Sequence, residues 1–419
     1  MFYARLILRR TSRLRGKFLG VRESTGSSWK GVRFVLTFIH RRFGFLIRHL
    51  LAYSLRRPAK VAARGGTDST PSHLALRISG GLGDYVVAAL YVRDLLAQIR
   101  PATFDIFCND SDRAEWIFRD LAGFGGSYTE FLFGELKDDY DVALQIGHVL
   151  SMHNKPLRLR KLRHDNHALF RVVDNVLRFK PLIAPLMRDD PTFDNFVARR
   201  IVYMNFNRAN FLQHMAGIAL GDGRLPLRTD PQLVDRLRLR RRGFITVHNG
   251  FDPAVVTVNS RSTKNYPHFA EVVRLIKAAH PELAMVQLGT RNSQPIDGVD
   301  HNLIGQTDLP QAAAILQHAA WHVDVESGLV HLAHCLGTRS TVVFGPTPAD
   351  YFGYEDNDNI SPAACGGCWW INETWMSHCP RGFATPICTN QPPMTIAHSV
   401  LDAIRRKRPE PLARVALIR

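Results

Sequence analysis

The sequence predicts an α/β protein with two lobes, each built around a mainly parallel sheet. Segments of strand and helix character alternate twice along the chain, and a less regular, basic stretch at about residues 150–242 separates the two series. Such alternation is typical of parallel α/β units. A chain of 419 residues is long enough for two cores. We therefore expect a cleft between two lobes, with ligands bound at the carboxyl ends of the strands.

A basic arm precedes the first lobe. Residues 1–60 hold 15 of the 54 Lys and Arg residues and a single acid, so most of the net charge of +17 lies there. Its charge-free runs are far shorter than the ~20 residues that span a bilayer. We interpret residues 1–72 as an amphipathic arm and linker that lies on an anionic membrane surface. A disordered solubilising tail and an organellar targeting peptide are the alternatives. The nearly neutral remainder argues against nucleic acid as a partner.

The elements of the two lobes follow from their apolar patterns. The first lobe is placed at residues 73–242 and the second at 243–419. In the first lobe, strands are expected at 74–78, 103–109 and 141–147, and helices at 84–99 and 111–123. In the second lobe, strands are expected at 244–250, 284–290, 321–327 and 340–346, and helices at 266–281 and 309–320.

The first strand leads into a glycine-rich turn, Gly80-Gly81-Leu82-Gly83, which is followed by Asp84. A strand, such a turn and a helix start let the backbone approach a ligand. The third glycine of the dinucleotide fingerprint is missing. Asp84 is either a helix cap that interacts with the dipole, or a general base that takes a proton from an acceptor hydroxyl.

The second lobe has two polar segments at helix starts. Ser262, Thr263 and Lys264 supply hydroxyls and an ammonium, a set that suits a diphosphate, although such a loop can also serve only as a cap. Further along, Glu326-Ser327-Gly328 ends a strand, and the next helix carries His331. Ser327 and the Gly328 backbone can donate to phosphate, and Glu326 can accept from sugar hydroxyls or cap the helix. His331 can equally be a buried core residue.

Four of the six cysteines form a cluster near the C-terminus. Cys365, Cys368, Cys379 and Cys388 have the spacing C-x2-C-x10-C-x8-C. A closed tetrahedral thiolate site with zinc or iron fits this spacing, and disulfides or unconnected thiols are the alternatives. So few cysteines in a chain of this length indicate a reducing compartment. A site with four thiolates and no open position would be structural.

Together these motifs resemble glycosyltransferase family 9, the bacterial ADP-heptose:lipopolysaccharide heptosyltransferases. The turn with Asp84 is similar to the family's "GD" turn, and Lys264 before Tyr266-Pro267 to its "K-x-W-P" segment. Residues 305–309 are similar to its "G-x-T-x-L" turn, and residues 326–331 to its "D-[ST]-G-x-x-H" motif, with Glu326 in place of the aspartate. Residues 342–347, "VVFGPT", are similar to the strand that follows. The cysteine cluster 365–388 resembles that of the autotransporter heptosyltransferases, in which iron is bound.

The resemblance implies a GT-B fold and inverting transfer from a nucleotide sugar, with Asp84 as catalytic base and no catalytic metal. The implied substrate-binding residues are Gly81, Gly83, Thr263, Lys264, Glu326, Ser327, Gly328 and His331. We expect a heptose to pass from ADP-heptose to a lipopolysaccharide core-type glycolipid, by a cytoplasmic enzyme peripherally associated with the inner membrane. The alternatives are a heptosyltransferase with a protein (autotransporter) acceptor, a nucleotide-binding oxidoreductase, and a non-catalytic membrane scaffold.

Overall fold

A computed structural model describes residues 51, 71–153, 157–186, 193–239, 243–250, 262–291 and 293–407. Residues 71–419 form one compact unit, distinct from residues 1–70. The predicted basic arm therefore lies outside the described residues, apart from Leu51 and the end of the linker. In the part of the chain that the structure describes, no helix combines the length and the apolar character needed to cross a bilayer.

The first sheet has the strand order β3-β2-β1-β4-β5, and only the β4–β5 pair is antiparallel. Its strands are β1 (Ser72–Ile78), β2 (Ala102–Cys108), β3 (Phe124–Thr129), β4 (Val142–Ile146) and β5 (Leu150–Met152). The helices around it are α4 (Leu82–Leu96), α5 (Ser111–Phe118), α6 (Phe133–Leu136), α7 (Leu157–Asp165), α8 (His167–Ile183), α9 (Phe193–Tyr203) and α10 (Phe211–Ala216). Short 3-10 turns lie at Glu130–Leu132, Lys137–Asp139 and Ala184–Leu186. The central strands are apolar almost throughout, as strands covered on both faces must be.

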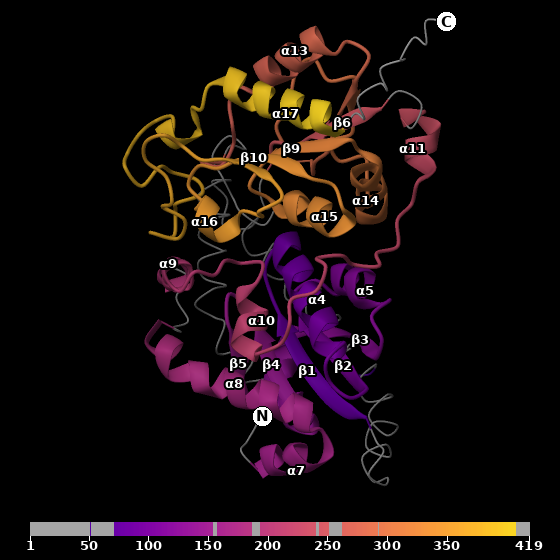
Figure 1. Ribbon diagram of the computed structural model, residues 1–419, viewed down its shortest axis with the longest axis vertical. Helices are drawn as coiled ribbons and strands as arrows, with labels where there is room; N and C mark the ends of the chain where they lie inside the picture. Colours follow the sequence, from indigo (N-terminus) through magenta and orange to yellow (C-terminus); the bar gives the residue numbers. More distant parts are fainter. Residues whose placement is uncertain are drawn as a thin grey trace, which may run out of the picture. The chain divides into compact units, whose positions relative to one another are not determined.

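The second sheet has the order β11-β10-β9-β6-β7-β8 and is parallel throughout. Its strands are β6 (Phe244–Val247), β7 (Ala284–Gln287), β8 (His301–Asn302), β9 (Trp321–Val325), β10 (Ser340–Val343) and β11 (Asp358–Ile360). Its helices are α11 (Gln232–Arg236), α13 (Phe269–Ala279), α14 (Leu309–His318), α15 (Gly328–Leu336), α16 (Ala349–Phe352) and α17 (Pro393–Lys407), with a 3-10 turn at Ile387–Thr389. Helix α11, which precedes the predicted boundary at residue 242, packs against α14. Two such sheets confirm the predicted two-lobed α/β fold (Figure 1).

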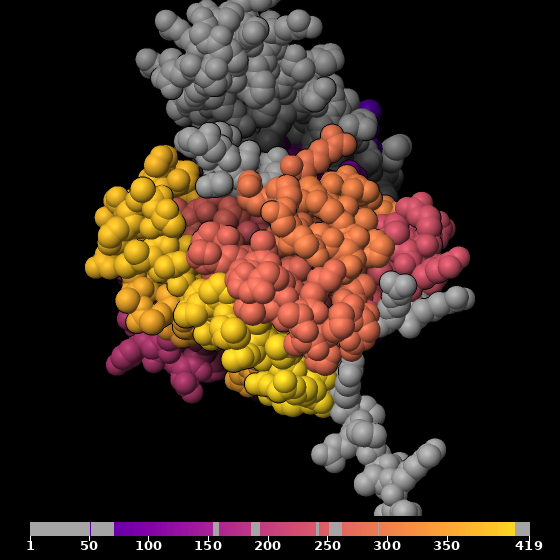
Figure 2. Space-filling view, turned by 90° about the horizontal axis from the view of Figure 1, so that it is seen from above, coloured from indigo at the N-terminus to yellow at the C-terminus, as the bar shows by residue number. Residues whose placement is uncertain are grey.

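The apolar core continues from one lobe into the other. One buried cluster combines the first sheet and α4 with residues of α14 and α15. A second cluster fills the opposite face of the second sheet, beneath α13 and α17. Figure 2 looks onto that outer face, where α17, in yellow, lies beside α13. Helices α4 and α15, which lie next to each other in Figure 1, therefore connect the lobes by direct packing.

Two glycines allow this close approach. A Cβ on Gly83 of α4 would overlap the imidazole of His331 on α15. A Cβ on Gly328, the first residue of α15, would lie 2.8 Å from the Cβ of Leu82. His331 is buried, so its ring cannot swing aside into solvent. The N-termini of the two helices can therefore meet only because neither position carries a side chain.

We expect Gly83→Ala to lower the free energy of unfolding by about 1–3 kcal/mol, because the added methyl overpacks the lobe junction. Equilibrium urea denaturation would measure the loss. Gly134→Ala is the matched control, because a Cβ at that position meets nothing within 4 Å. An unchanged urea midpoint for Gly83→Ala would contradict this prediction, because it would show that the lobe junction accommodates the added methyl.

Candidate active site

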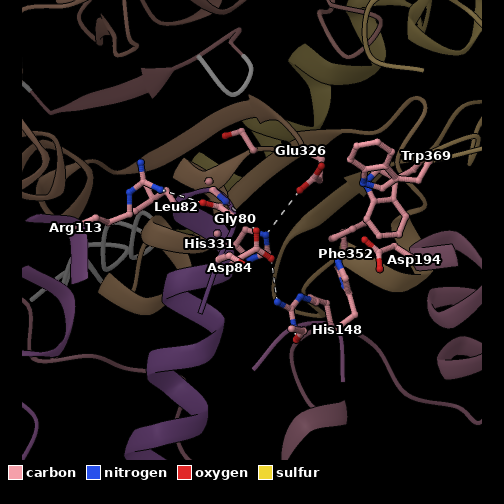
Figure 3. A pocket seen from close by; sticks show the side chains of 18 of the residues that line it. Gly80, Leu82, Asp84, Arg113, His148, Asp194, Glu326, His331, Phe352 and Trp369 are labelled. Atoms are coloured by element: carbon pink, nitrogen blue, oxygen red, sulfur yellow. Dashed lines mark hydrogen bonds and ion pairs between the residues drawn. The ribbon is translucent and has the colours of Figure 1, made fainter. Parts of the chain in front are cut away.

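A cleft of about 1200 Å³ lies between the lobes, at the carboxyl ends of strands from both sheets. The first lobe contributes the turn after β1, the segment around β5, and parts of α8 and α9. The second lobe contributes the ends of β6, β7 and β9, the starts of α14 and α15, and several tryptophans near residue 370. This is the edge of a parallel sheet at which α/β proteins bind ligands. Figure 3 shows side chains from both lobes around the cleft.

Asp84 is placed in the cleft by the turn after β1. The turn includes Gly80 at φ +128°, a conformation that favours glycine. Helix α4 begins at Leu82, so Asp84 lies in its first turn, and its Oδ2 accepts the backbone N–H of Gly81 at 3.0 Å. Asp84 thus stabilises the helix start and also lines the cleft. The cap role and the base role are compatible in one residue.

Arg208 holds the other oxygen of this carboxylate. Its Nη2 donates to Oδ1 of Asp84 at 3.1 Å, and its Nη1 donates to the Gly147 carbonyl at 2.9 Å. The Arg208 side chain is only 4% exposed, whereas that of Asp84 is 35% exposed. The guanidinium therefore anchors the carboxylate from below and leaves it open to the cleft. A hydroxyl entering the cleft can reach Asp84 as a proton acceptor.

Lys264 and Glu326 form a buried ion pair on the other side of the cleft. Lys264 Nζ lies 2.6 Å from Oε2 of Glu326, and Nε2 of His331 lies 3.7 Å from Oε1. Burial disfavours the charged form of Glu326, but Lys264 and His331 outweigh it and lower the pKa of its carboxyl to about 2. His331 is oriented by the Tyr354 hydroxyl, 2.7 Å from Nδ1. An ammonium has three N–H donors, so Lys264 can keep its ion pair with Glu326 and still donate to a phosphate.

The hydroxyls of Thr263 and Ser327, predicted to donate to a phosphate, donate within the protein in this structure. Thr263 Oγ1 donates to the Trp375 carbonyl at 2.8 Å, and Ser327 Oγ donates to Asp324 at 2.5 Å. Each hydroxyl has a single proton, so neither is available to a phosphate as placed. Ser327 also accepts the N–H of Leu329 as the N-cap of α15. As placed, the two hydroxyls fasten the segments that carry Lys264 and Gly328, while Ser327 itself lines the cleft.

The second lobe also points two helix N-termini at the cleft. Helix α14 starts at Leu309 behind its cap Asp308, and α15 starts at Gly328. Thr307, Asp308, Leu309, Ser327 and Gly328 all line the cleft. Helix N-termini carry partial positive charge and favour an anionic ligand. Beside them, Leu288 and Ala312 add an apolar wall. The arrangement suits a ligand that has both an anionic and an apolar part.

Two further titratable groups line the first lobe's side of the cleft. Burial, assisted by Arg208, lowers the pKa of His148 to about 3, so its ring is neutral and pairs with the Tyr351 hydroxyl at 2.8 Å. Burial raises the pKa of Asp194 to about 6, and Asp84 raises it further while Arg208 opposes the shift. Neither residue was predicted from the sequence, because neither belongs to a local motif.

The shift at Asp194 predicts a pH-dependent stability. Its folded pKa lies above the ordinary 3.8, so the folded state holds the proton more tightly than the unfolded chain. The fold therefore loses stability as pH rises from about 4 to 6 and does not regain that contribution at higher pH. We expect Asp194→Asn to raise the free energy of unfolding by about 1–3 kcal/mol at pH 7.5 and by almost nothing near pH 4.

Urea denaturation of both proteins across this pH range measures the difference. Asp112→Asn is the control, because Asp112 is also a first-turn acid but is exposed on α5. An equal gain at both pH values would contradict the prediction.

The four clustered cysteines lie on one irregular segment. All six cysteines of the chain fall within the described residues and are free thiols. Burial raises the pKa of the Cys388 thiol to about 12, and the charges of Cys368, Cys365 and Cys379 raise it further. Nevertheless, the described residues contain no group of three or more His, Cys, Asp or Glu side chains arranged to hold a metal ion. The donors suit zinc or iron chemically, and the predicted metal site stays a prediction.

The comparisons with known proteins begin with the sequence. Residues 254–365 match the family model "Glycosyltransferase family 9 (heptosyltransferase)". The resemblance to glycosyltransferase family 9 is confirmed. With it, the predicted enzyme class, a glycosyltransferase of family 9 type, is confirmed. The match covers Lys264, Glu326 and both helix N-termini that face the cleft. No curated protein matches the chain.

Solved structures extend the comparison to the fold. The dodecameric iron-containing heptosyltransferase TibC from enterotoxigenic E. coli is 14% identical, with 80% of this chain and 76% of that chain covered and a TM-score of 0.51. TibC in complex with ADP-D-β-D-heptose is 13% identical, with the same coverage and TM-score. A family 9 glycosyltransferase from Veillonella parvula is 10% identical, with 80% and 98% covered and a TM-score of 0.49. The similarity to TibC supports the predicted GT-B fold.

The family 9 motifs and the cleft agree in position. Asp84, Gly81 and Gly83 of the first lobe and Lys264, Glu326, Ser327, Gly328 and His331 of the second lobe all line it. Thr263 lies beside them and does not line the cleft itself. Gly83 serves the lobe junction, as described above. The family 9 motifs did not point to Arg208, His148 or Asp194, which come from outside them, and no local signal marks these residues in the sequence.

Proposed function

We propose that this chain transfers a heptose from ADP-heptose to a lipopolysaccharide core-type glycolipid, with inversion at the anomeric carbon. One observation carries the proposal: the Asp84 carboxylate and the Lys264 ammonium line the same cleft from opposite lobes. A base on one side and a cation on the other are what a single displacement requires. The structure of TibC in complex with ADP-D-β-D-heptose supports the choice of donor.

In this reaction the acceptor hydroxyl attacks the anomeric carbon, and its proton passes to Asp84. The bond between that carbon and the diphosphate breaks, and ADP leaves with the electron pair. Lys264 and the N-termini of α14 and α15 stabilise the charge that develops on the diphosphate. The apolar wall of Leu288 and Ala312 suits the nucleobase. These groups supply the positive charge at the diphosphate, and no step of the proposed reaction is assigned to a divalent metal.

The test is a donor panel followed by a transfer assay. The melting temperature of purified protein would be measured with ADP-heptose, UDP-glucose or GDP-mannose. Unheated protein would separately be incubated with ADP-heptose and a heptose-deficient lipopolysaccharide. We expect ADP-heptose alone to raise the melting temperature, and mass spectrometry to find one added heptose. Equal stabilisation by all three donors, or a product with retained configuration, would contradict the proposal.

A protein acceptor is the second candidate. It is favoured by the cysteine cluster, which resembles that of the autotransporter heptosyltransferases. A serine-rich autotransporter fragment belongs in the same assay. Heptose transfer to this fragment and not to lipopolysaccharide would select the second candidate.

We also propose that Cys365, Cys368, Cys379 and Cys388 hold a structural zinc or iron ion. The C-x2-C-x10-C-x8-C spacing supports this, as does the similarity of the chain to TibC, an iron-containing glycosyltransferase. Metal analysis of protein purified without chelator should find about one ion per chain in the wild type and none after Cys365→Ser. Metal-free protein whose melting temperature equals that of the wild type would argue against a structural ion at these cysteines.

A peripheral place on the cytoplasmic face of the inner membrane is part of the same proposal. Helix α7 adds the exposed side chains of Arg160, Lys161 and Arg163 to the positive charge of residues 1–60. Basic residues near an anionic bilayer contribute on the order of 1 kcal/mol each. Co-sedimentation with phosphatidylglycerol vesicles but not with phosphatidylcholine vesicles is the expected result.

A further inference from the structure

His248 lines the cleft but takes part in none of the steps proposed above. It directly follows strand β6, and its backbone N–H donates to the Val323 carbonyl at 3.0 Å, which fixes it at the carboxyl end of the sheet. Its side chain is 8% exposed. A buried imidazole needs a hydrogen-bond partner for each of its two ring nitrogens. The two nitrogens of His248 differ in this respect.

One ring nitrogen of His248 has its partner inside the second lobe. Nδ1 lies 2.8 Å from Oδ1 of Asp324, which is fully buried. The other oxygen of this carboxylate accepts the Ser327 hydroxyl at 2.5 Å and lies 3.2 Å from Nε2 of His322. A carboxylate only accepts hydrogen bonds, so Nδ1 of His248 carries a proton. Asp324 therefore sets both the tautomer and the orientation of the His248 ring.

The other ring nitrogen of His248, Nε2, forms no hydrogen bond within the part of the chain that the structure describes. In the neutral ring it is an acceptor, since Nδ1 holds the proton. It lies in a confined polar corner, because a Cβ on Gly250 would be 2.4 Å from Nε2 and 2.6 Å from Oγ of Ser293. The Ser293 hydroxyl is buried and also has no partner among the described residues. Two such polar groups side by side indicate a polar ligand.

Of the two groups, a ligand in the cleft can reach His248. Ser293 does not line the cleft, and its hydroxyl oxygen is closed to solvent. Nε2 of His248 is not among the buried atoms that lack a partner, so the ring offers this nitrogen to the cleft. The expected ligand group is a hydroxyl, which can donate its proton to a neutral imidazole nitrogen.

The strand order indicates which part of the donor reaches this nitrogen. β6 lies between β9 and β7 in the second sheet. Lys264, the cation proposed for the diphosphate, pairs with Glu326 just after β9, and Leu288 of the apolar wall proposed for the nucleobase directly follows β7. Neighbouring strands are about 4.8 Å apart, so roughly two strand spacings separate these groups. The ribose connects nucleobase and diphosphate, so it passes over the end of β6, where His248 lies.

We propose that His248 binds the ribose of the donor: Nε2 accepts a ribose hydroxyl, and Asp324 holds the ring in the tautomer that can accept it. This rests on the proposed function and assigns a part of its nucleotide that none of the steps above uses. The ribose is unchanged by the reaction, so the contact also forms with free ADP. The site is then selective for ribose over a deoxygenated ring, because a missing hydroxyl leaves Nε2 without a partner in a desolvated site.

The experiment compares ADP with 2′,3′-dideoxy-ADP, which lacks both ribose hydroxyls, by calorimetry on the full chain. We expect the wild type to bind ADP about fivefold more tightly or better, the effect of one hydrogen bond. His248→Asn should bring the two dissociation constants to within about twofold of each other. The asparagine amide can still donate to Asp324 from the position of Nδ1, but it has no atom at the position of Nε2.

His248→Gln is the matched variant. Its longer amide places an acceptor at the position of Nε2 but no longer donates to Asp324. The preference for ADP should therefore persist, while the melting temperature falls. A folded His248→Asn protein that keeps the preference would overturn the proposal, and so would a wild type that binds both nucleotides equally. Loss of the preference in both variants would also overturn it, because His248 would then act only through its packing.

A control variant and the transfer assay complete the test. His398→Asn is the control, because His398 of α17 is exposed and does not line the cleft. It should leave both dissociation constants within about twofold of the wild type. A wild type that prefers ADP in this way but transfers no heptose would support this inference and count against the proposed function. A wild type that binds neither nucleotide would overturn both.

Discussion

Asp84→Asn should lower the turnover of heptose transfer by about 10²–10⁴-fold while ADP binds with nearly unchanged affinity. A positioned general base contributes about this much, because without it the attacking hydroxyl keeps its proton in the transition state. The amide oxygen can still accept the Gly81 N–H, so the start of α4 is preserved. The fall should therefore appear in kcat and not in the affinity for the donor.

Steady-state kinetics and ADP calorimetry on the same samples would measure both quantities. Asp110→Asn is the control, because Asp110 caps the neighbouring helix α5 and does not line the cleft. Its transfer rate should stay within about twofold of the wild type. Because Asp84→Asn also removes the anion from the buried Arg208, the assay temperature must lie well below the melting temperature of the variant. Wild-type turnover in a folded Asp84→Asn protein would assign the base to another residue.

The fold was predictable where strands are long and buried. β1, β2, β4, β6, β7, β9 and β10 are apolar runs bounded by turn residues, and each was predicted from that pattern. The missed strands lie at or next to the sheet edges and are short or interrupted. β3 contains Gly125 and Gly126, and β5, β8 and β11 have only two or three residues. Too few side chains are buried in such strands to leave a periodic signal.

Helix starts show a similar limit. The sequence placed the start of the first helix at Asp84, whereas α4 begins at Leu82. The reason is that Asp84 accepts the backbone N–H of Gly81 from inside the first turn and does not precede the helix. An acid at either position stabilises the same dipole, so composition alone cannot distinguish them.

The candidate site was predictable only where its residues belong to local motifs. Asp84, Lys264 and Glu326 stand in short segments whose residue types indicate their chemistry. Arg208 reaches Asp84 across 124 residues of sequence, and its position depends on how the chain folds back after α9. Thr263 donates its hydroxyl to the Trp375 carbonyl, 112 residues away, and no local pattern predicts that hydrogen bond either. Local patterns predict which groups are present, and tertiary packing decides which of them are free.

Lys264→Met should have two separable effects, one on stability and one on transfer. The change leaves Glu326 buried and without its cation, and breaking such a pair costs about 3–5 kcal/mol of unfolding free energy. Loss of the charge that stabilises the departing diphosphate should lower kcat/KM by about 10²–10³-fold. Urea denaturation and initial-rate kinetics would measure the two effects.

The double variant Lys264→Met with Glu326→Gln separates them. Removing both charges relieves the unpaired carboxylate, so most of the lost stability should return, whereas transfer should stay as low as in the single variant. Lys277→Met is the control for stability: Lys277 pairs with Asp300 at 2.7 Å, but the pair is about one-third exposed, so its loss should cost no more than about 1 kcal/mol. If the double variant recovered transfer together with stability, Lys264 would act only by neutralising Glu326, and the diphosphate would be held by the N-termini of α14 and α15 alone.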